Sequence, residues 1–235
     1  MEKKLALLVD KMRAALGDRL VAVILYGSGA SGEHHEKYSD LNVLCVTTTV
    51  TPHELAAAEP VVRWWLGEGN PSPLLLSRAE VVGSADVFAI EFHDMLEQRR
   101  VLWGEDVIDG LKIERTFYRA QVEHDLRSKL LRLRQKGAAV LSDNTALLTL
   151  MLDSVSTFCV LLRHAMLLAG IAAGTKKRDV VARLGEIGVE RGPFERLLDL
   201  REGRAKAKDV VPGALFESYL AQVDAAVTFV DQLAK

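Results

Sequence analysis

The spacing of hydrophobic positions changes near Gly110, and this change predicts two structural halves. Before Gly110, short apolar runs rich in Val, Ile and Leu are typical of strands. The predicted strands span residues 20–26, 42–47, 74–76, 87–92 and 100–103. Residues 2–16 instead repeat their apolar positions every three or four residues, which predicts a helix that ends at Gly17. The first half therefore combines helices with strands.

Two further helices in the first half are predicted from their N-terminal signals. Thr51 and Glu54 are spaced as a capping box with a proline between them, and Ser77 and Glu80 repeat the same spacing. Pro60 lies inside the first of these helices and is expected to kink or divide it.

After Gly110 the apolar positions keep helical spacing to the end of the chain. The predicted helices include a long apolar one that begins at Asp143 or Asn144 and ends near Gly170, and a last one that begins at Pro212. We therefore expect an α+β protein, with a mixed sheet and helices over residues 1–110 and an antiparallel all-α bundle over residues 111–235.

The candidate chemistry lies between the first two predicted strands. Gly27-Ser28-Gly29 follows the first strand as a tight turn, and small residues there allow a phosphate to approach backbone amides closely. Asp40 and Asn42 stand where the second strand begins. A carboxylate that faces such a turn is suited to holding a divalent metal against a phosphate.

This stretch resembles the nucleotidyltransferase superfamily of the DNA polymerase β and kanamycin nucleotidyltransferase type. The resemblance implies that Gly27 and Ser28 bind a nucleoside triphosphate, and that the acid-x-acid pair on the next strand binds Mg²⁺. It also implies transfer of a nucleoside monophosphate to an acceptor, whose identity the sequence leaves open, and a helical half equivalent to a substrate domain. This chain departs from the pattern at Asn42, which offers a carbonyl oxygen to a metal but no charge.

The resemblance also implies a third carboxylate, on a later strand, that binds metal or activates the attacking hydroxyl. Glu91 and Asp94 are the two candidates, and we favour Glu91 because it falls inside the predicted strand 87–92. A surface glutamate on an edge strand is the alternative reading of Glu91. The predicted metal ligands are thus Asp40, Asn42 and Glu91, with Asp40 and Glu91 as the catalytic pair.

Asn42 gives rise to a second hypothesis. Loss of one metal-directed charge weakens the case for catalysis, so the chain is alternatively a catalytically inactive module that binds nucleotide or another protein. A homo-oligomer is left open by the sequence.

The composition and net charge of the chain limit the classes of partner that it is expected to bind. The chain has 235 residues, 49% hydrophobic, with 30 basic and 32 acidic residues and a net charge of -2, so no chain-wide affinity for nucleic acid is expected.

Cys45 and Cys159 lie in apolar runs and are typical of free thiols in a reducing compartment. Asp153, Arg163 and His164 interrupt the long apolar helix, which favours a buried helix over a membrane span. We expect a cytoplasmic protein.

Two histidine positions have structural interpretations. Glu33-His34-His35-Glu36 is expected to be a solvated loop. His164 is expected to be buried and paired with Asp153 or a backbone carbonyl.

Overall fold

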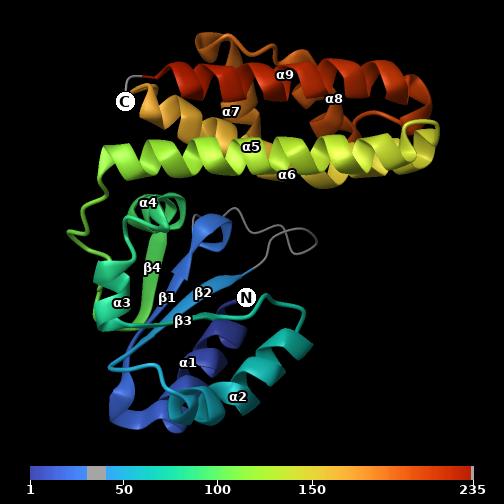
Figure 1. Ribbon diagram of the computed structural model, residues 1–235. Helices are drawn as coiled ribbons and strands as arrows, with labels where there is room; N and C mark the ends of the chain where they lie inside the picture. The colour runs from blue at the N-terminus through green and yellow to red at the C-terminus, as the bar shows by residue number, and fades with distance from the viewer. Residues whose placement is uncertain (31–40, 234–235) are drawn as a thin grey trace. The chain divides into compact units, whose positions relative to one another are not determined.

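The computed structural model describes residues 1–30 and 41–233, which divide into two compact units (Figure 1). The first unit is Met1–Glu114 and the second is Arg115–Lys235. The first contains a sheet with helices, and the described part of the second contains helices and no strand. The division lies a few residues beyond Gly110, where the hydrophobic spacing changes.

A mixed four-stranded sheet forms the centre of the first unit. Its strands are β1 (Leu20–Tyr26), β2 (Asn42–Thr47), β3 (Leu74–Ser77) and β4 (Arg99–Gly104), in the order β3-β2-β1-β4. The central strand β1 is antiparallel to both β2 and β4, while β3 is parallel to β2. The mixed sheet and four of the five predicted strands are therefore confirmed.

Helices cover both faces of this sheet (Figure 1). They are α1 (Glu2–Leu16), α2 (Pro52–Gly67), α3 (Arg78–Gly83) and α4 (Ala89–Glu97). Alternate residues of β1 point to opposite faces. Val23 and Leu25 pack with α1 and α2, whereas Ala22 and Ile24 pack with Val81 of α3 and the apolar side of α4. The sheet is thus buried on both faces, which explains why its strands read as continuous apolar runs.

The predicted strand at residues 87–92 is wrong, because this segment forms α4. Its buried residues Ala89, Phe92 and Met95 recur every three positions, which is a helical spacing. The alternation that suggested a strand covers only six residues and does not continue through Met95. Glu91 consequently lies in the first turn of a helix rather than on a strand.

Both predicted capping boxes are present, at the starts of α2 and α3. In the first, the Thr51 hydroxyl accepts a hydrogen bond from the His53 N–H, and Glu54 Oε2 accepts one from the Thr51 N–H at 3.0 Å. Helix α2 is not divided at Pro60. Pro60 and Ala56 are both exposed, so water can satisfy the Ala56 carbonyl that the proline leaves without an intrahelical donor.

Glu54 makes the stability of the first unit dependent on pH. The Thr51 hydroxyl and backbone and the Arg19 guanidinium, 3.0 Å away, hold the pKa of this carboxyl at about 2, below its ordinary value of 4.5. Because the folded pKa is lowered, the stabilisation is complete above pH 4.5 and is lost as the pH falls toward 2. We expect Glu54→Gln to flatten the fall in unfolding free energy over this range. Denaturant titrations at several pH values measure it, and Glu59→Gln on the exposed side of α2 is the control.

The second unit is a bundle built around one long apolar helix. Its helices are α5 (Arg115–Val140), α6 (Asn144–Leu168), α7 (Lys177–Ala182), α8 (Gly192–Arg201) and α9 (Pro212–Gln232). Helix α6 packs against the other four, and only three residues join it to α5, so these two neighbours run antiparallel (Figure 1). Asp143 caps α6 by accepting hydrogen bonds from the N–H groups of Thr145 and Ala146 at 2.9 and 3.0 Å.

Helix α6 is long and apolar enough to cross a membrane by length and composition, and 44% of its most apolar window is buried inside the structure. Its His164 is fully buried and lies 2.6 Å, through Nδ1, from the Tyr118 hydroxyl of α5. The predicted pairing with Asp153 is wrong. Asp153 is exposed and lies eleven positions earlier on the same helix, a rise of roughly 16 Å.

Short 3-10 turns complete the structure. They are at Gly17–Arg19, Gly27–Gly29, Leu184–Ile187 and Ala207–Asp209. The turn at Gly27–Gly29 continues directly from β1 and therefore lies at one rim of the sheet.

Candidate functional site

The turn after β1 has a backbone conformation that favours glycine. Gly27 has φ 71°, in the left-handed region that side chains rarely adopt. Its N–H donates a hydrogen bond to the Gln98 carbonyl at 3.2 Å, and its own carbonyl accepts one from the Ala30 N–H at 2.9 Å. The turn is thereby tied to the segment that joins α4 to β4.

Asn42 lies next to this turn. It is paired with Tyr26 across β1 and β2, and a Cβ atom placed on Gly27 would lie 3.4 Å from Asn42 Nδ2. The structure therefore brings the side chain of Asn42 against Gly27. Rotation of the amide by half a turn would present its carbonyl oxygen, a suitable ligand for a hard cation, at the same place.

Glu91 is the candidate carboxylate of α4 and lies in the first turn of that helix. Burial raises the pKa of the Tyr26 phenol, and the negative charge of Glu91 raises it further. Tyr26 ends β1 directly before Gly27, so the charge of Glu91 acts on the residue next to the turn. Glu91 is exposed. The other candidate, Asp94, follows it by one turn of α4.

Arg99 fixes α4 and β4 relative to the rim. Its guanidinium donates hydrogen bonds to the Leu96 carbonyl at 2.8 Å and to both oxygens of Asp106 at 2.9 and 3.0 Å. The Arg99 backbone is paired with Tyr26. Arg99 thus joins the C-terminal end of α4 to the strand beside the turn.

Sequence reasoning did not identify Tyr26 or Arg99 as parts of the site. The signal for Tyr26 was available, because it is the one polar group at the end of an apolar strand and directly precedes the turn. No local signal marks Arg99, whose partners come from α4 and from the loop after β4.

Three sequence expectations lie outside what the structure describes. They concern Asp40, the side chain of Ser28, and the run Glu33-His34-His35-Glu36. Among the described residues, no three His, Cys, Asp or Glu side chains gather as a metal site. The described part of the predicted metal set is Asn42 with Glu91, and both supply the oxygen atoms that Mg²⁺ prefers.

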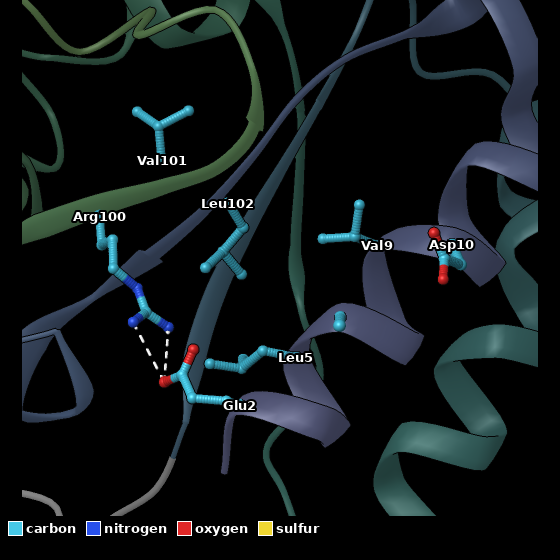
Figure 2. A pocket seen from close by; sticks show the side chains of 8 residues that line it. Glu2, Leu5, Val9, Asp10, Arg100, Val101 and Leu102 are labelled. Atoms are coloured by element: carbon cyan, nitrogen blue, oxygen red, sulfur yellow. Dashed lines mark hydrogen bonds and ion pairs between the residues drawn. The ribbon is translucent and has the colours of Figure 1, made fainter.

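A separate hollow of about 370 Å³ lies between α1 and β4, on the face of the sheet opposite α4 (Figure 2). Figure 2 shows Arg100 of β4 directed at Glu2 of α1, with both of its terminal nitrogens 3.1 Å from one Glu2 oxygen. The hollow's other carboxylate, Asp10, lies eight residues further along α1, a rise of roughly 12 Å. Two carboxylates so far apart do not hold one metal ion, so this hollow is not a rival metal site.

Comparison with known proteins supports a fold and no closer relationship. No family model matches the chain, and no curated protein matches it. The crystal structure of a spectinomycin adenyltransferase from Enterococcus faecialis, with ATP and spectinomycin, matches with a TM-score of 0.60 and 12% identity. The match covers 94% of this chain and 99% of that one.

A second solved structure, a toxin-antitoxin with AMP-PNP, matches with a TM-score of 0.32 and 17% identity over 59% of this chain and 96% of that one. That score is too low to support an argument. At 12% identity the first match shows the fold alone, and its coverage extends over both the mixed sheet and the helices.

Proposed function

We propose that this chain, which has the nucleotidyltransferase fold, binds a nucleoside triphosphate at the Gly27–Gly29 turn and transfers its nucleoside monophosphate to an acceptor hydroxyl. The observation that carries the proposal is the placement of Asn42 against the Gly27 turn at one rim of the sheet, with the charge of Glu91 acting on Tyr26 directly before that turn. A glycine turn, a neutral oxygen ligand and a carboxylate are the groups that a metal-bound triphosphate needs.

Each residue has a distinct role in this proposal. The Gly27 N–H donates to the Gln98 carbonyl, so the turn at Gly27 and Ser28 would hold the terminal phosphates through the backbone amides that follow Gly27. No side chain at Gly27 obstructs their approach. Asp40, Asn42 and Glu91 would hold Mg²⁺. Bound Mg²⁺ would neutralise phosphate charge and lower the pKa of the attacking hydroxyl.

The transfer is an in-line displacement at the α-phosphorus. The acceptor oxygen forms a bond to this phosphorus, the bond to the β-phosphate bridging oxygen breaks, and pyrophosphate leaves with the bonding electrons. Glu91 accepts the proton of the acceptor hydroxyl. A carboxylate is suited to this role when it lies within hydrogen-bond reach of the hydroxyl in the bound complex.

Asn42 favours a second function, that of a nucleotide-binding module with little or no transfer activity. Its amide makes a weaker metal ligand than a carboxylate because it carries no charge. On this alternative the turn binds a triphosphate as a sensor. Both functions require the same triphosphate site, so binding is the first property to test, and we infer a cytoplasmic protein in either case.

We expect a nucleoside triphosphate with Mg²⁺ to raise the melting temperature of the full chain, since a ligand that binds only the folded state stabilises it. Ser28→Trp should remove the rise by filling the turn with a bulky side chain. Ser142→Trp, in the exposed connection between α5 and α6, is the matched control and should keep it. An equal rise in the Ser28→Trp protein would place the nucleotide elsewhere.

A further inference from the structure

One residue, Gln98, joins the end of α4 to the start of β4, and both of its backbone polar groups are hydrogen-bonded. Its N–H donates to the Asp94 carbonyl at 2.8 Å, and its carbonyl accepts the hydrogen bond from the Gly27 N–H at 3.2 Å. The direction of the Gln98 carbonyl is therefore set by α4 on one side and by β4 on the other. That carbonyl holds the first amide of the turn, where Gly27 has φ 71°.

Arg99, the first residue of β4, turns its side chain back onto the end of α4. Its guanidinium donates hydrogen bonds to the Leu96 carbonyl at 2.8 Å and to the Met95 carbonyl at 3.4 Å. These carbonyls belong to the last turn of the helix, where intrahelical donors are missing and a positive charge is favoured. The side chain of Arg99 thus fixes the helix end from which the Gln98 connection leaves.

The same guanidinium is held from the other side by the segment that follows β4. Its Nε lies 2.9 and 3.0 Å from the two carboxylate oxygens of Asp106, and its Nη2 lies 3.4 Å from Asp109. All three nitrogens of Arg99 are therefore engaged, and only 16% of the side chain is exposed. A guanidinium held in this way is not a direct ligand for a phosphate, so any effect of Arg99 on the turn passes through the backbone.

The backbone of Arg99 also reaches the turn through the sheet. Arg99 is paired with Tyr26 across β4 and β1, and Tyr26 is paired on its other side with Asn42 of β2. The three residues form one row across neighbouring strands, and Tyr26 directly precedes Gly27. A shift at the start of β4 would reach Gly27 by two routes, the Gln98 carbonyl and the Tyr26 backbone.

We propose that Arg99 is a positioning residue for the triphosphate site. It holds the Gln98 connection, and the Gln98 carbonyl holds Gly27 in the left-handed conformation that presents the following amides to the phosphates. This inference rests on the proposed function and adds to it a residue that contacts no ligand. A turn that adopts its binding conformation for only part of the time loses affinity by that fraction, and one hydrogen bond changes such an equilibrium about 3- to 10-fold.

The test combines two measurements on the full chain. NMR follows hydrogen exchange of the Gly27 amide without ligand, and calorimetry gives the affinity for inorganic tripolyphosphate with Mg²⁺. We expect Arg99→Gln to speed exchange at Gly27 and to weaken tripolyphosphate binding, each about 3- to 10-fold. Asp106→Asn, which keeps the guanidinium but removes the charge that orients it, should cause a smaller loss of the same kind and carries the comparison if Arg99→Gln does not fold.

Arg100→Gln is the matched control. It breaks the ion pair with Glu2 at the next position of β4, away from α4, and should change neither measurement. Exchange that rises equally throughout the sheet in Arg99→Gln, or equal loss of affinity in Arg99→Gln and Arg100→Gln, would indicate a general loss of stability and overturn the inference.

The two measurements also separate this inference from the function on which it rests. Tripolyphosphate that binds the Arg99→Gln and unmodified proteins equally would show that the positioning role is wrong while the triphosphate site stands. If the unmodified chain does not bind tripolyphosphate, the proposed function fails, and the positioning role fails with it.

Discussion

Gly104→Ala should destabilise the first unit by about 2–5 kcal/mol, because the new methyl group has no space. A Cβ atom on Gly104 would lie 2.1 Å from the Val21 carbonyl oxygen and 3.0 Å from the Ala22 Cα, both in the backbone of β1. The same Val21 carbonyl accepts a hydrogen bond from the Glu105 N–H at 3.2 Å, so the strands cannot separate without losing it. Gly104 also has φ 82°, where alanine is strained.

Gly110→Ala separates the clash from the strain. Gly110 has φ 73°, but a Cβ atom there would have no neighbour within 4 Å. We expect a loss of only about 1–2 kcal/mol, from the left-handed backbone alone. Urea titrations followed by circular dichroism measure both variants. Equal losses in the two proteins would show that β4 can move away from β1.

The second large effect concerns the residue that departs from the nucleotidyltransferase pattern. We expect Asn42→Asp to tighten Mg²⁺ binding about 10- to 100-fold with a triphosphate present, because it restores a negative charge beside Gly27. Two unit charges about 4 Å apart interact by about 4 kcal/mol at an effective dielectric constant near 20, and desolvation offsets part of this. Asn42→Ala should weaken binding.

Titration of Mg²⁺ at a fixed triphosphate concentration measures these changes. Asn144→Asp adds the same charge at an exposed position of α6 and should leave the affinity unchanged. An Asn42→Asp protein with unchanged Mg²⁺ affinity would mean that this side chain does not face the metal. The inactive binding module would then be the better account.

Local patterns predicted most of the elements. The bounds of α1, β1 and β2 follow from apolar runs that end at turn-forming residues, such as Gly17 and Gly27. Both capping boxes were predictable because their hydrogen bonds join residues only three apart. Residues 87–92 were misread because six residues are too few to distinguish alternation from a helical period.

The sequence motif of the candidate site was predictable, but the contacts between distant segments that surround it were not. Gly27 and Asn42 were identified from their places at strand ends, and the antiparallel pairing of Tyr26 with Asn42 brings them together. Glu91 was selected for a strand that is in fact helix α4, and its metal-binding role stays a prediction. The position of α4 depends on long-range packing, including the Arg99 contacts with its C-terminal end, which no local pattern encodes.

The most direct measurement of the central claim is the affinity of the full chain for ATP, with Mg²⁺ and with a chelator, in the unmodified protein and in Asp40→Ala. Asp40 is the one full carboxylate expected beside the turn on the second strand. Isothermal titration calorimetry should show ATP binding that weakens at least tenfold when Mg²⁺ is removed, and a similar weakening in Asp40→Ala with Mg²⁺ present. ATP affinity that is the same in all these conditions would contradict a metal-dependent triphosphate site at the Gly27 turn.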